Sequence, residues 1–424
     1  MAAVPLHRNR DFVLLQAGQL LSAAGTQTAS IAYPLLVLAV TGSPAQAGLV
    51  AFVRMLPMAL LALPAGLAAD RWPRKALMIA ADVVRALAIA CLAIAVALDE
   101  AALWAILVIG LVEGAGTAVF HTAQTGALRA VVPVRQLPAA AAVQSGRRAA
   151  VTVVGPPLGG VLFGVGRALP FIADAISYAF SSLALLAMRT PFQEQRSRER
   201  TPLRAQVAEG YRFLWSQPFL RACSFYYGLA NFVAPGLLFS LVVVAEQQGL
   251  SGGEVGLLVA IFGVCVVIGS PLSALVRRRL PASTVMLLEP WAWLACAAFL
   301  VWPNAYVLAA SIVPAALAIP STDSIGHGYR MAMTPDRLLG RVEAVWTTTA
   351  LTIAPLGPLV AGLLLADSPR AAIGVFVVFS LALALYGTFN PAIRAAPRLS
   401  ELDEHAALAG PEADEAVAMG PGHL

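Results

Sequence analysis

The chain has 424 residues, of which 59% are hydrophobic and only 12% charged, with a mean hydropathy of +0.78 and a formal net charge of +5. Soluble globular proteins carry about 25% charged residues. This chain therefore lacks the polar surface that a water-exposed body needs, and a lipid bilayer is its expected solvent. A membrane helix needs roughly 20 apolar residues, which leaves room for about twelve such helices. The positive charge is interpreted as membrane topology, and no nucleic-acid partner is expected.

Long apolar runs follow one another along the chain, without the alternation of apolar and polar residues that marks a barrel strand. Because only helices and closed barrels satisfy their backbone hydrogen bonds in lipid, these runs predict membrane helices. The expected spans are 12–40, 45–69, 75–98, 101–130, 138–165 and 168–188, followed by 217–247, 253–276, 282–302, 304–333, 338–366 and 368–390. The predicted fold class is an all-α integral membrane protein with two bundles of six transmembrane helices.

A long polar stretch separates the two sets of spans. The expected parts are an N-terminal half at 1–188, a cytoplasmic linker at 189–216, a C-terminal half at 217–390 and a disordered cytoplasmic tail at 391–424. The linker residues with amphipathic helical spacing are Leu203, Val207, Tyr211 and Leu214. This spacing predicts a helix that lies along the membrane surface.

Basic residues gather in the loops on one side of the predicted bundle. They include Arg8, Arg10, Arg71, Arg74, Lys75, Arg129, Arg135, those of the linker, Arg277, Arg278, Arg279, Arg337, Arg341, Arg394 and Arg398. The opposite side has little beyond Arg167 and Arg370. Since basic loops stay in the cytoplasm, both termini and the linker are predicted to be cytoplasmic, in a multi-pass protein of the inner cell membrane.

The two halves match each other at an offset of about 202 residues. The matches that depend on proline, arginine or glycine are Pro133 to Leu137 with Pro335 to Leu339, Gly155-Pro156 with Gly357-Pro358, and Gly160 with Gly362. A duplicated pair of membrane bundles places a substrate site at the interface of the halves, near the membrane midplane. The repeat therefore predicts a transporter.

The loop between the second and third spans carries a charged motif, Gly66-Leu-Ala-Ala-Asp-Arg-Trp-Pro-Arg-Lys75. It resembles the signature of the major facilitator superfamily, Gly-x-x-x-Asp-Arg-x-Gly-Arg-Arg/Lys, with proline in place of the second glycine. The resemblance implies a cytoplasmic latch between the halves, with gating residues Gly66, Asp70, Arg71, Arg74 and Lys75. The simpler alternative is a basic loop that only fixes orientation.

The fifth span contains Gly155-Pro156-Pro157-Leu158-Gly159-Gly160. This segment resembles the Gly-Pro-x-x-Gly-Gly motif of exporters in the same superfamily, and Gly155, Pro156, Gly159 and Gly160 match it. Small residues allow helices to approach closely and proline bends a helix. A kinked, close-packed helix without influence on transport direction is therefore the alternative interpretation.

Further segments resemble the branch that contains enterobactin-type and macrolide exporters. They are Asn9 to Phe12, Phe120 to Val143 and Pro170 to Ser177. The resemblance implies a monomeric secondary transporter without cofactor that exports a small hydrophobic or amphipathic molecule by alternating access, in exchange for protons. A nutrient or metabolite importer of the same fold is the alternative. No Walker loop, zinc-ligand spacing or nucleophile elbow is present, so an enzyme is not expected.

Ionisable residues inside membrane spans are costly and are functional candidates by default. Glu113 is the expected proton-coupling carboxylate, with Arg54 tuning its affinity for the proton, unless the two form a static buried ion pair. Asp323 and Glu289 are further coupling candidates. For Asp323, a salt-bridge network with His327 and Arg330 is the competing interpretation.

Two other groups of charges are assigned to structural roles. Asp82 and Arg85, one helical turn apart, are expected to belong to the cytoplasmic latch, and Asp174 is expected to be structural.

By analogy with the superfamily, the first, fourth, seventh and tenth spans should form the cavity walls. Their polar and aromatic residues are Gln19, Gln27, Tyr33, Phe120, Tyr226, Tyr227, Asn231 and Phe232. Such a lining suits a bulky, partly apolar ligand. We count no run of charges there that would suit an anion. Aromatic residues at this spacing are also compatible with plain packing.

Overall fold

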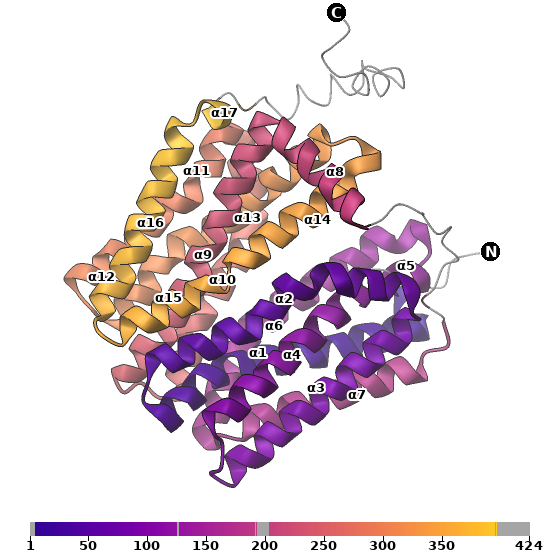
Figure 1. The fold of residues 1–424 in the computed structure, drawn as a ribbon, viewed down its shortest axis with the longest axis vertical. Coiled ribbons are helices and arrows are strands. Elements are labelled where there is room, and N and C mark those ends of the chain that lie inside the picture. Colours follow the sequence, from indigo (N-terminus) through magenta and orange to yellow (C-terminus); the bar gives the residue numbers. More distant parts are fainter. Residues whose placement is uncertain (1–4, 125–126, 191, 193–202, 395, 397–424) are drawn as a thin grey trace, which may run out of the picture.

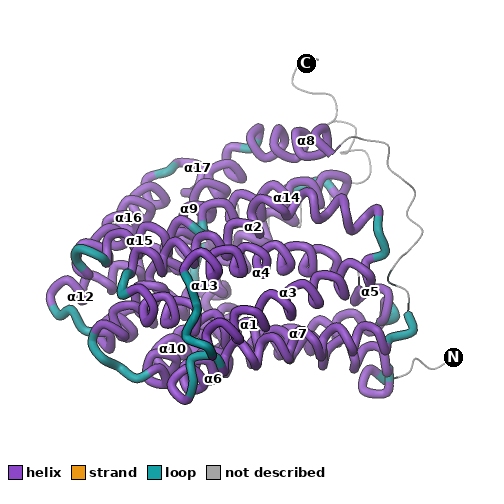
Figure 2. Tube along the Cα trace, turned by 60° about the horizontal axis from the view of Figure 1, so that its bottom comes forward, coloured by secondary structure: helices purple, strands orange, loops and turns teal. Residues whose placement is uncertain are grey.

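The computed structural model describes residues 5–124, 127–190, 192, 203–394 and 396. Within this part of the chain every regular element is a helix, and twelve helices are long and apolar enough to cross a membrane (Figures 1 and 2). The predicted all-α membrane fold is therefore confirmed. The tail that was expected to be disordered lies outside the described residues, apart from a short helix, α17 (Pro391–Arg394), and residue 396.

The N-terminal half contains six long helices. They are α1 (Arg10–Thr41), α2 (Pro44–Arg71), α3 (Arg74–Ala97), α4 (Leu103–Gln124), α6 (Leu137–Val165) and α7 (Leu169–Ala187), with a short helix α5 (Ala127–Val131) after α4. The residues between α1 and α2 explain where the first helix ends and the second begins. Gly42 ends α1 with a φ of 66°, a conformation that glycine adopts without strain. The Ser43 hydroxyl then caps α2 by accepting a hydrogen bond from the Gln46 amide.

The C-terminal half repeats the arrangement. Its helices are α9 (Pro218–Gln247), α10 (Gly252–Arg279), α11 (Ala282–Trp293), α12 (Ala298–Val301), α13 (Ala305–Met333), α14 (Asp336–Ile353), α15 (Leu356–Leu365) and α16 (Pro369–Phe389). Two predicted spans are interrupted: 282–302 contains α11, a 3₁₀ helix at Leu294–Ala297 and α12, and 338–366 is divided into α14 and α15. The second of them breaks at Ala354-Pro355, where proline cannot donate the next helical hydrogen bond.

Pro290 lies inside α11, three residues before this helix ends at Trp293 and the 3₁₀ helix begins. Pro290 lacks the N–H that would bond the carbonyl of Met286, four residues earlier. The Tyr226 hydroxyl, on α9, donates to that carbonyl. Tyr226 is fully buried. A tyrosine from one helix thus satisfies a carbonyl that proline leaves open in another.

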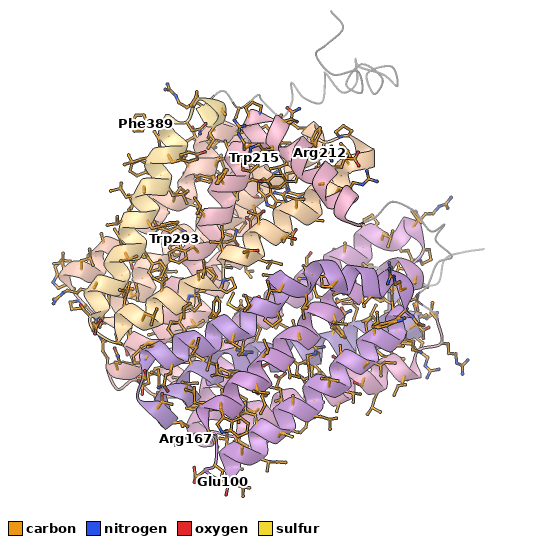
Figure 3. The ribbon with its side chains drawn as sticks, in the orientation of Figure 1. Glu100, Arg167, Arg212, Trp215, Trp293 and Phe389 are labelled. Carbon is orange, nitrogen blue, oxygen red and sulfur yellow. The ribbon has the colours of Figure 1, made fainter. Side chains whose placement is uncertain are left out.

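The two ends of the bundle differ in how the halves meet. We call the end at which α1 begins and α16 ends the terminal side, and the opposite end the far side. The helices of the two halves are close together at the far side and diverge toward the terminal side (Figure 1). Glu100 and Arg167 lie at the far side, and Arg212 and Trp215 at the terminal side (Figure 3).

Glycines form two seams between the halves at the far side. In one seam Gly160 of α6 packs against Gly252 and Gly256 of α10. In the other, Gly362 of α15 packs against Gly48 of α2. Since Gly160 and Gly362 correspond at the 202-residue offset, the seams are the two copies of one contact.

The linker helix α8 (Leu203–Ser216) lies on the terminal side and packs against α14. Glu209 forms an ion pair with Arg341, and Leu214 is buried. Tyr211 and Trp215 stack with ring centroids 5.0 Å apart and remain partly exposed. The helix predicted from the linker pattern is present, and it is fixed to the C-terminal half by an ion pair as well as by apolar contacts.

Candidate functional site: a cavity between the halves

A cavity of about 490 Å³ lies between the two halves. From the N-terminal half it is lined by Thr26, Gln27, Ser30, Ile31, Tyr33, Pro34, Ala47, Ala51, Arg54, Met55, Met58, Glu113, Gly114, Thr117, Thr152 and Pro156. From the C-terminal half it is lined by Pro235, Leu238, Phe239, Val242, Val259, Phe262, Gly263, Leu351, Ala354, Pro355 and Pro358. The C-terminal wall is almost entirely apolar, and the N-terminal wall carries the charges.

Arg54 and Glu113 form a two-pronged ion pair in the N-terminal wall. Arg54 Nε lies 3.2 Å from Glu113 Oε2, and Nη2 lies 3.0 Å from Oε1. Glu113 is 2% exposed. The Arg54 guanidinium also lies 3.7 Å from the centre of the Tyr33 ring, a cation–π contact. The three residues come from α2, α4 and α1, so the pair holds three helices together beside the cavity.

Glycines make room for this pair. A Cβ on Gly114 would lie 2.2 Å from the Arg54 carbonyl oxygen, and a Cβ on Gly110 would lie 2.7 Å from Arg54 Cγ. Glu113 therefore lies between two glycines. The missing side chain of Gly114 leaves room for the α2 backbone, and that of Gly110 leaves room for the Arg54 side chain.

A further carboxylate lies behind the cavity wall. Asp174 of α7 is fully buried, and one of its oxygens accepts a hydrogen bond from the Ser177 hydroxyl. No described residue donates a hydrogen bond to its buried Oδ2. Gly25 of α1 packs directly on this group, since a Cβ there would lie 2.6 Å from Asp174 Oδ1. Asp174 is therefore packed between α7 and α1, and it is not part of the cavity lining.

Asp82 and Arg85 pair within α3, inside the N-terminal half. The Arg85 guanidinium lies 4.2 Å from the Tyr178 ring centre and 4.7 Å from that of Phe120, and its Nη1 is 3.5 Å from Thr117 Oγ1. The expectation that this pair belongs to the latch was wrong, because Arg85 points into the bundle of its own half. Phe120 is likewise buried beneath Arg85 and does not line the cavity.

The aromatic residues predicted on the seventh span pack inside the C-terminal half. Tyr226 binds the Met286 carbonyl, Tyr227 donates to the Thr322 carbonyl at 2.8 Å, and Phe232 contacts Phe376 at 5.1 Å between ring centroids. Asn231 is exposed, and its amide donates to the Tyr227 carbonyl. None of these four residues is in the cavity lining, and the packing alternative describes the three buried aromatic residues better.

The predicted carboxylates of the C-terminal half lie apart from the cavity lining. Glu289 is buried in α11 and accepts a hydrogen bond from Trp293 Nε1 at 3.3 Å. Asp323 is exposed on α13 and forms no ion pair with a described residue. Of the expected network, Arg330 Nη2 lies 3.4 Å from His327 Nδ1, but Arg330 forms its ion pair with Glu343 of α14, at 2.8 Å, and not with Asp323.

In this conformation two basic residues of the latch motif donate hydrogen bonds to backbone carbonyls of the N-terminal half. Lys75 Nζ donates to the Met188 carbonyl at 2.6 Å, and Arg74 Nε donates to the Ala69 carbonyl at 3.3 Å. Arg71 is exposed, and a Cβ on Gly66 would meet only the Thr122 methyl group, at 3.9 Å. The side chain of Asp70 lies outside the described part of the chain.

The Gly-Pro motif of α6 lies at helix crossings. A Cβ on Gly155 would lie 2.5 Å from Gln27 Cβ, and one on Gly159 would lie 2.3 Å from the Thr28 carbonyl oxygen. Gly160 belongs to the far-side seam, and Pro156 lines the cavity. The motif thus joins α6 to α1 within one half and to α10 of the other half.

Arg147 and Arg148 lie inside the predicted span 138–165 but were not among the predicted site residues. The search for cavity residues covered the first, fourth, seventh and tenth spans, so it did not include these two arginines of the fifth span. Arg147 donates to the Gln19 side chain, which explains why the predicted cavity residue Gln19 is buried. The signal was available, since the rule that selects membrane-embedded charges applies equally to this Arg-Arg pair.

Comparisons with known proteins agree with this architecture. The chain matches the family model of the Major Facilitator Superfamily over residues 16–244 and 224–411. It is 29% identical to the multidrug efflux pump Tap of Mycobacterium tuberculosis over 415 residues, which cover 94% of this chain and 96% of that protein. It is 25% identical to the enterobactin exporter EntS of Escherichia coli over 334 residues, which cover 78% of this chain and 80% of that protein.

The fold is similar to that of a bacterial homologue of the iron transporter ferroportin. Its inward-facing structure has a TM-score of 0.71 at 15% identity, with 91% of this chain and 99% of that one covered. Its outward-facing structure has a TM-score of 0.62 at 16% identity, with 90% and 98% covered. The repeat, the latch motif, the twelve membrane helices and the family match together establish that this multi-pass membrane protein belongs to the Major Facilitator Superfamily, a family of transporters and not of enzymes.

Proposed function

We propose that this protein exports small hydrophobic or amphipathic molecules from the cytoplasm in exchange for protons, by alternating access. The observation that carries the proposal is the Arg54–Glu113 pair in the wall of a largely apolar cavity between the halves. An ionisable pair at membrane depth beside a substrate-sized cavity is the expected form of a coupling site. The names of the two relatives, a multidrug efflux pump and an enterobactin exporter, support the direction of transport.

The proposed location is the cytoplasmic membrane, with both termini in the cytoplasm. The basic loops lie on the terminal side, which the positive-inside rule assigns to the cytoplasm. With that orientation, the far-side glycine seams close the cavity from outside, and the structure corresponds to an inward-facing state. The higher TM-score with the inward-facing ferroportin homologue supports this assignment.

The geometry suggests how a proton could be exchanged for substrate. In the inward-facing state Glu113 accepts a hydrogen bond from each prong of the Arg54 guanidinium. When the cavity faces outside, a proton binds Glu113, the ion pair is lost and the exported molecule leaves. On return to the inward-facing state the proton passes to the cytoplasm, and the Arg54 pair forms again for the next cycle.

Everted membrane vesicles from a transporter-deficient bacterium provide the test. Vesicles that contain the protein should take up a fluorescent amphipathic dye when an inside-acid pH gradient is imposed, and nigericin should abolish uptake. Glu113→Gln should remove gradient-driven uptake while the protein remains monodisperse. Glu100→Gln is the matched control, because Glu100 lies exposed at the far side, outside the cavity.

Two outcomes would contradict the proposal. Gradient-driven uptake by Glu113→Gln at the unmodified rate would exclude Glu113 as the coupling group. Movement of substrates only out of the everted vesicles, driven by the same gradient, would instead support the importer alternative.

A further inference from the structure

Arg148 lies on the strip of α6 that faces the cavity. Thr152 and Pro156, four and eight residues later, line the cavity, and residues four apart share one helix face. Both residues lie within α6, and the Thr152 hydroxyl donates to the Arg148 carbonyl at 2.9 Å. The Arg148 side chain is exposed. Arg148 therefore continues the cavity-facing strip, one turn beyond Thr152 toward the terminal side and just outside the lining.

His121 occupies the corresponding place on α4. Gly114 and Thr117 line the cavity, and His121 follows one turn after Thr117, toward the terminal side. His121 is exposed and lies within electrostatic range of Arg148. The two residues, on α4 and α6, thus each lie one turn beyond the cavity lining toward the terminal side.

Neither Arg147 nor Arg148 forms an ion pair with a carboxylate of the described residues. Arg147 donates to the side-chain oxygen of the neutral Gln19 amide, and no described residue accepts a hydrogen bond from its buried Nε. Arginine at membrane depth is costly, and such residues usually pair with acidic groups or line a water-filled pathway. The positive charge of this Arg-Arg pair therefore lies near the cavity with no acidic partner in the described part of the chain.

We propose that Arg148 and His121 form a subsite for the anionic group, such as a carboxylate, of an amphipathic substrate whose apolar part occupies the cavity. The apolar part would contact Met55, Met58, Phe239 and Phe262, which line the cavity. Arginine suits this role because its planar guanidinium binds a carboxylate through two parallel hydrogen bonds. The inference rests on the proposed function in one respect: the amphipathic anion that binds here is the molecule that the protein transports.

The test uses two dyes with the same xanthene frame and opposite charge, fluorescein and rhodamine 123. Binding to the purified full-length protein in neutral-lipid nanodiscs at pH 7.5 is measured by fluorescence polarisation, without any ion gradient. We expect Arg148→Gln to weaken fluorescein binding about tenfold or more, the usual effect of losing a charged hydrogen bond. Rhodamine 123 should bind the variant within about twofold of the unmodified protein, or more tightly, because the loss of a cation does not weaken binding of a cation.

Two variants control for folding and for charge. Arg148→Lys keeps the charge without the paired donors and should retain intermediate affinity for fluorescein. Arg135→Gln removes an exposed arginine at the terminal side, before α6 begins, and should change neither affinity. Retained rhodamine 123 binding reports that Arg148→Gln is folded.

Each result separates the subsite from the transport proposal. Fluorescein binding that Arg148→Gln leaves unchanged, or no fluorescein binding at all, overturns the subsite even if vesicles export rhodamine 123. Fluorescein binding that depends on Arg148, combined with no gradient-driven transport of either dye, supports the subsite and contradicts the export proposal. Equal weakening of both dyes would indicate a packing role for Arg148 and would also overturn the subsite.

Discussion

Gly160 of α6 and Gly252 of α10 pack backbone against backbone across the interface of the halves, so closely that a Cβ on Gly160 would lie 1.9 Å from the Gly252 carbonyl oxygen. The second seam has the same character, because a Cβ on Gly362 would lie 2.5 Å from the Pro44 carbonyl oxygen and 2.8 Å from the Gly48 Cα. No side chain other than hydrogen fits these positions without moving a helix. The closed far side therefore depends on glycine at both seams.

Gly160→Ala should force the far side apart and favour the outward-open conformation, with transport reduced at least about tenfold if the shift exceeds 1.4 kcal/mol. The measurement is the labelling rate of a cysteine at Gln27, in the cavity, by a membrane-impermeant maleimide added outside intact cells. Gly164→Ala is the matched control, one turn further along α6, where a Cβ meets nothing within 4 Å. Equal labelling rates in the two alanine variants would show that the seam does not govern access.

Arg54→Ala should destabilise the protein strongly, because it leaves the buried Glu113 side chain without its partner. Breaking a buried ion pair typically costs about 3–5 kcal/mol, although the 16% exposure of the Arg54 side chain favours the lower end. Adding Glu113→Gln to Arg54→Ala should restore most of the loss. Thermal unfolding in detergent of the two single variants and the double variant measures this coupling. Additive effects would mean that the pair is not energetically linked.

Tyr226→Phe should cost about 1–3 kcal/mol of stability, since the Met286 carbonyl is then buried without a donor. The same substitution in a Pro290→Ala background should cost much less, because alanine restores the N–H that α11 lacks. Thermal unfolding of the four proteins forms a double-mutant cycle. A Tyr226→Phe effect that is independent of residue 290 would contradict the view that Tyr226 replaces the hydrogen bond that Pro290 cannot donate.

Asp11→Asn should loosen the segment that leaves the N-terminal half. Asp11 accepts hydrogen bonds from the amides of Arg189 and Thr190, at 3.1 Å and 2.8 Å, and from the Thr190 hydroxyl. Asparagine can keep one acceptor but loses the charge that strengthens these bonds. We expect trypsin to cleave after Arg189 several-fold faster in the variant. Asp367→Asn, an exposed position at the far side, is the control and should leave the rate unchanged.

Most helix limits were predictable because length and composition alone identify a membrane helix. The first span, predicted at 12–40, is observed as Arg10–Thr41, and the polar turn at Gly42 and Ser43 fixes its end. The interruption of 282–302 was not foreseen. The donor that the carbonyl freed by Pro290 finds was not foreseen either, because that donor, Tyr226, lies 60 residues away from Met286.

The rotation of each helix about its axis was the main information that the sequence did not supply. In a soluble helix the polar face marks the solvent, but a membrane helix is apolar toward lipid and toward its neighbours alike. Tyr226 and Phe232 were therefore assigned to the cavity when they pack within the C-terminal half. The proximity of Arg54 and Glu113 was predicted because an unpaired charge inside a membrane bundle is costly, so two opposite charges in one bundle are expected to pair.

The glycine seams have a consequence for how the protein responds to its ionic surroundings. The far side closes through uncharged backbone atoms at Gly160, Gly252, Gly48 and Gly362, so added salt has no Coulomb attraction there to screen. The terminal side carries the exposed Arg148, His121 and Asp323. If the two sides open in turn, as proposed, ionic strength should alter the rate at which the terminal side opens and closes while leaving far-side closure nearly unchanged. The two ends of this pseudo-symmetric molecule would then differ in their sensitivity to salt.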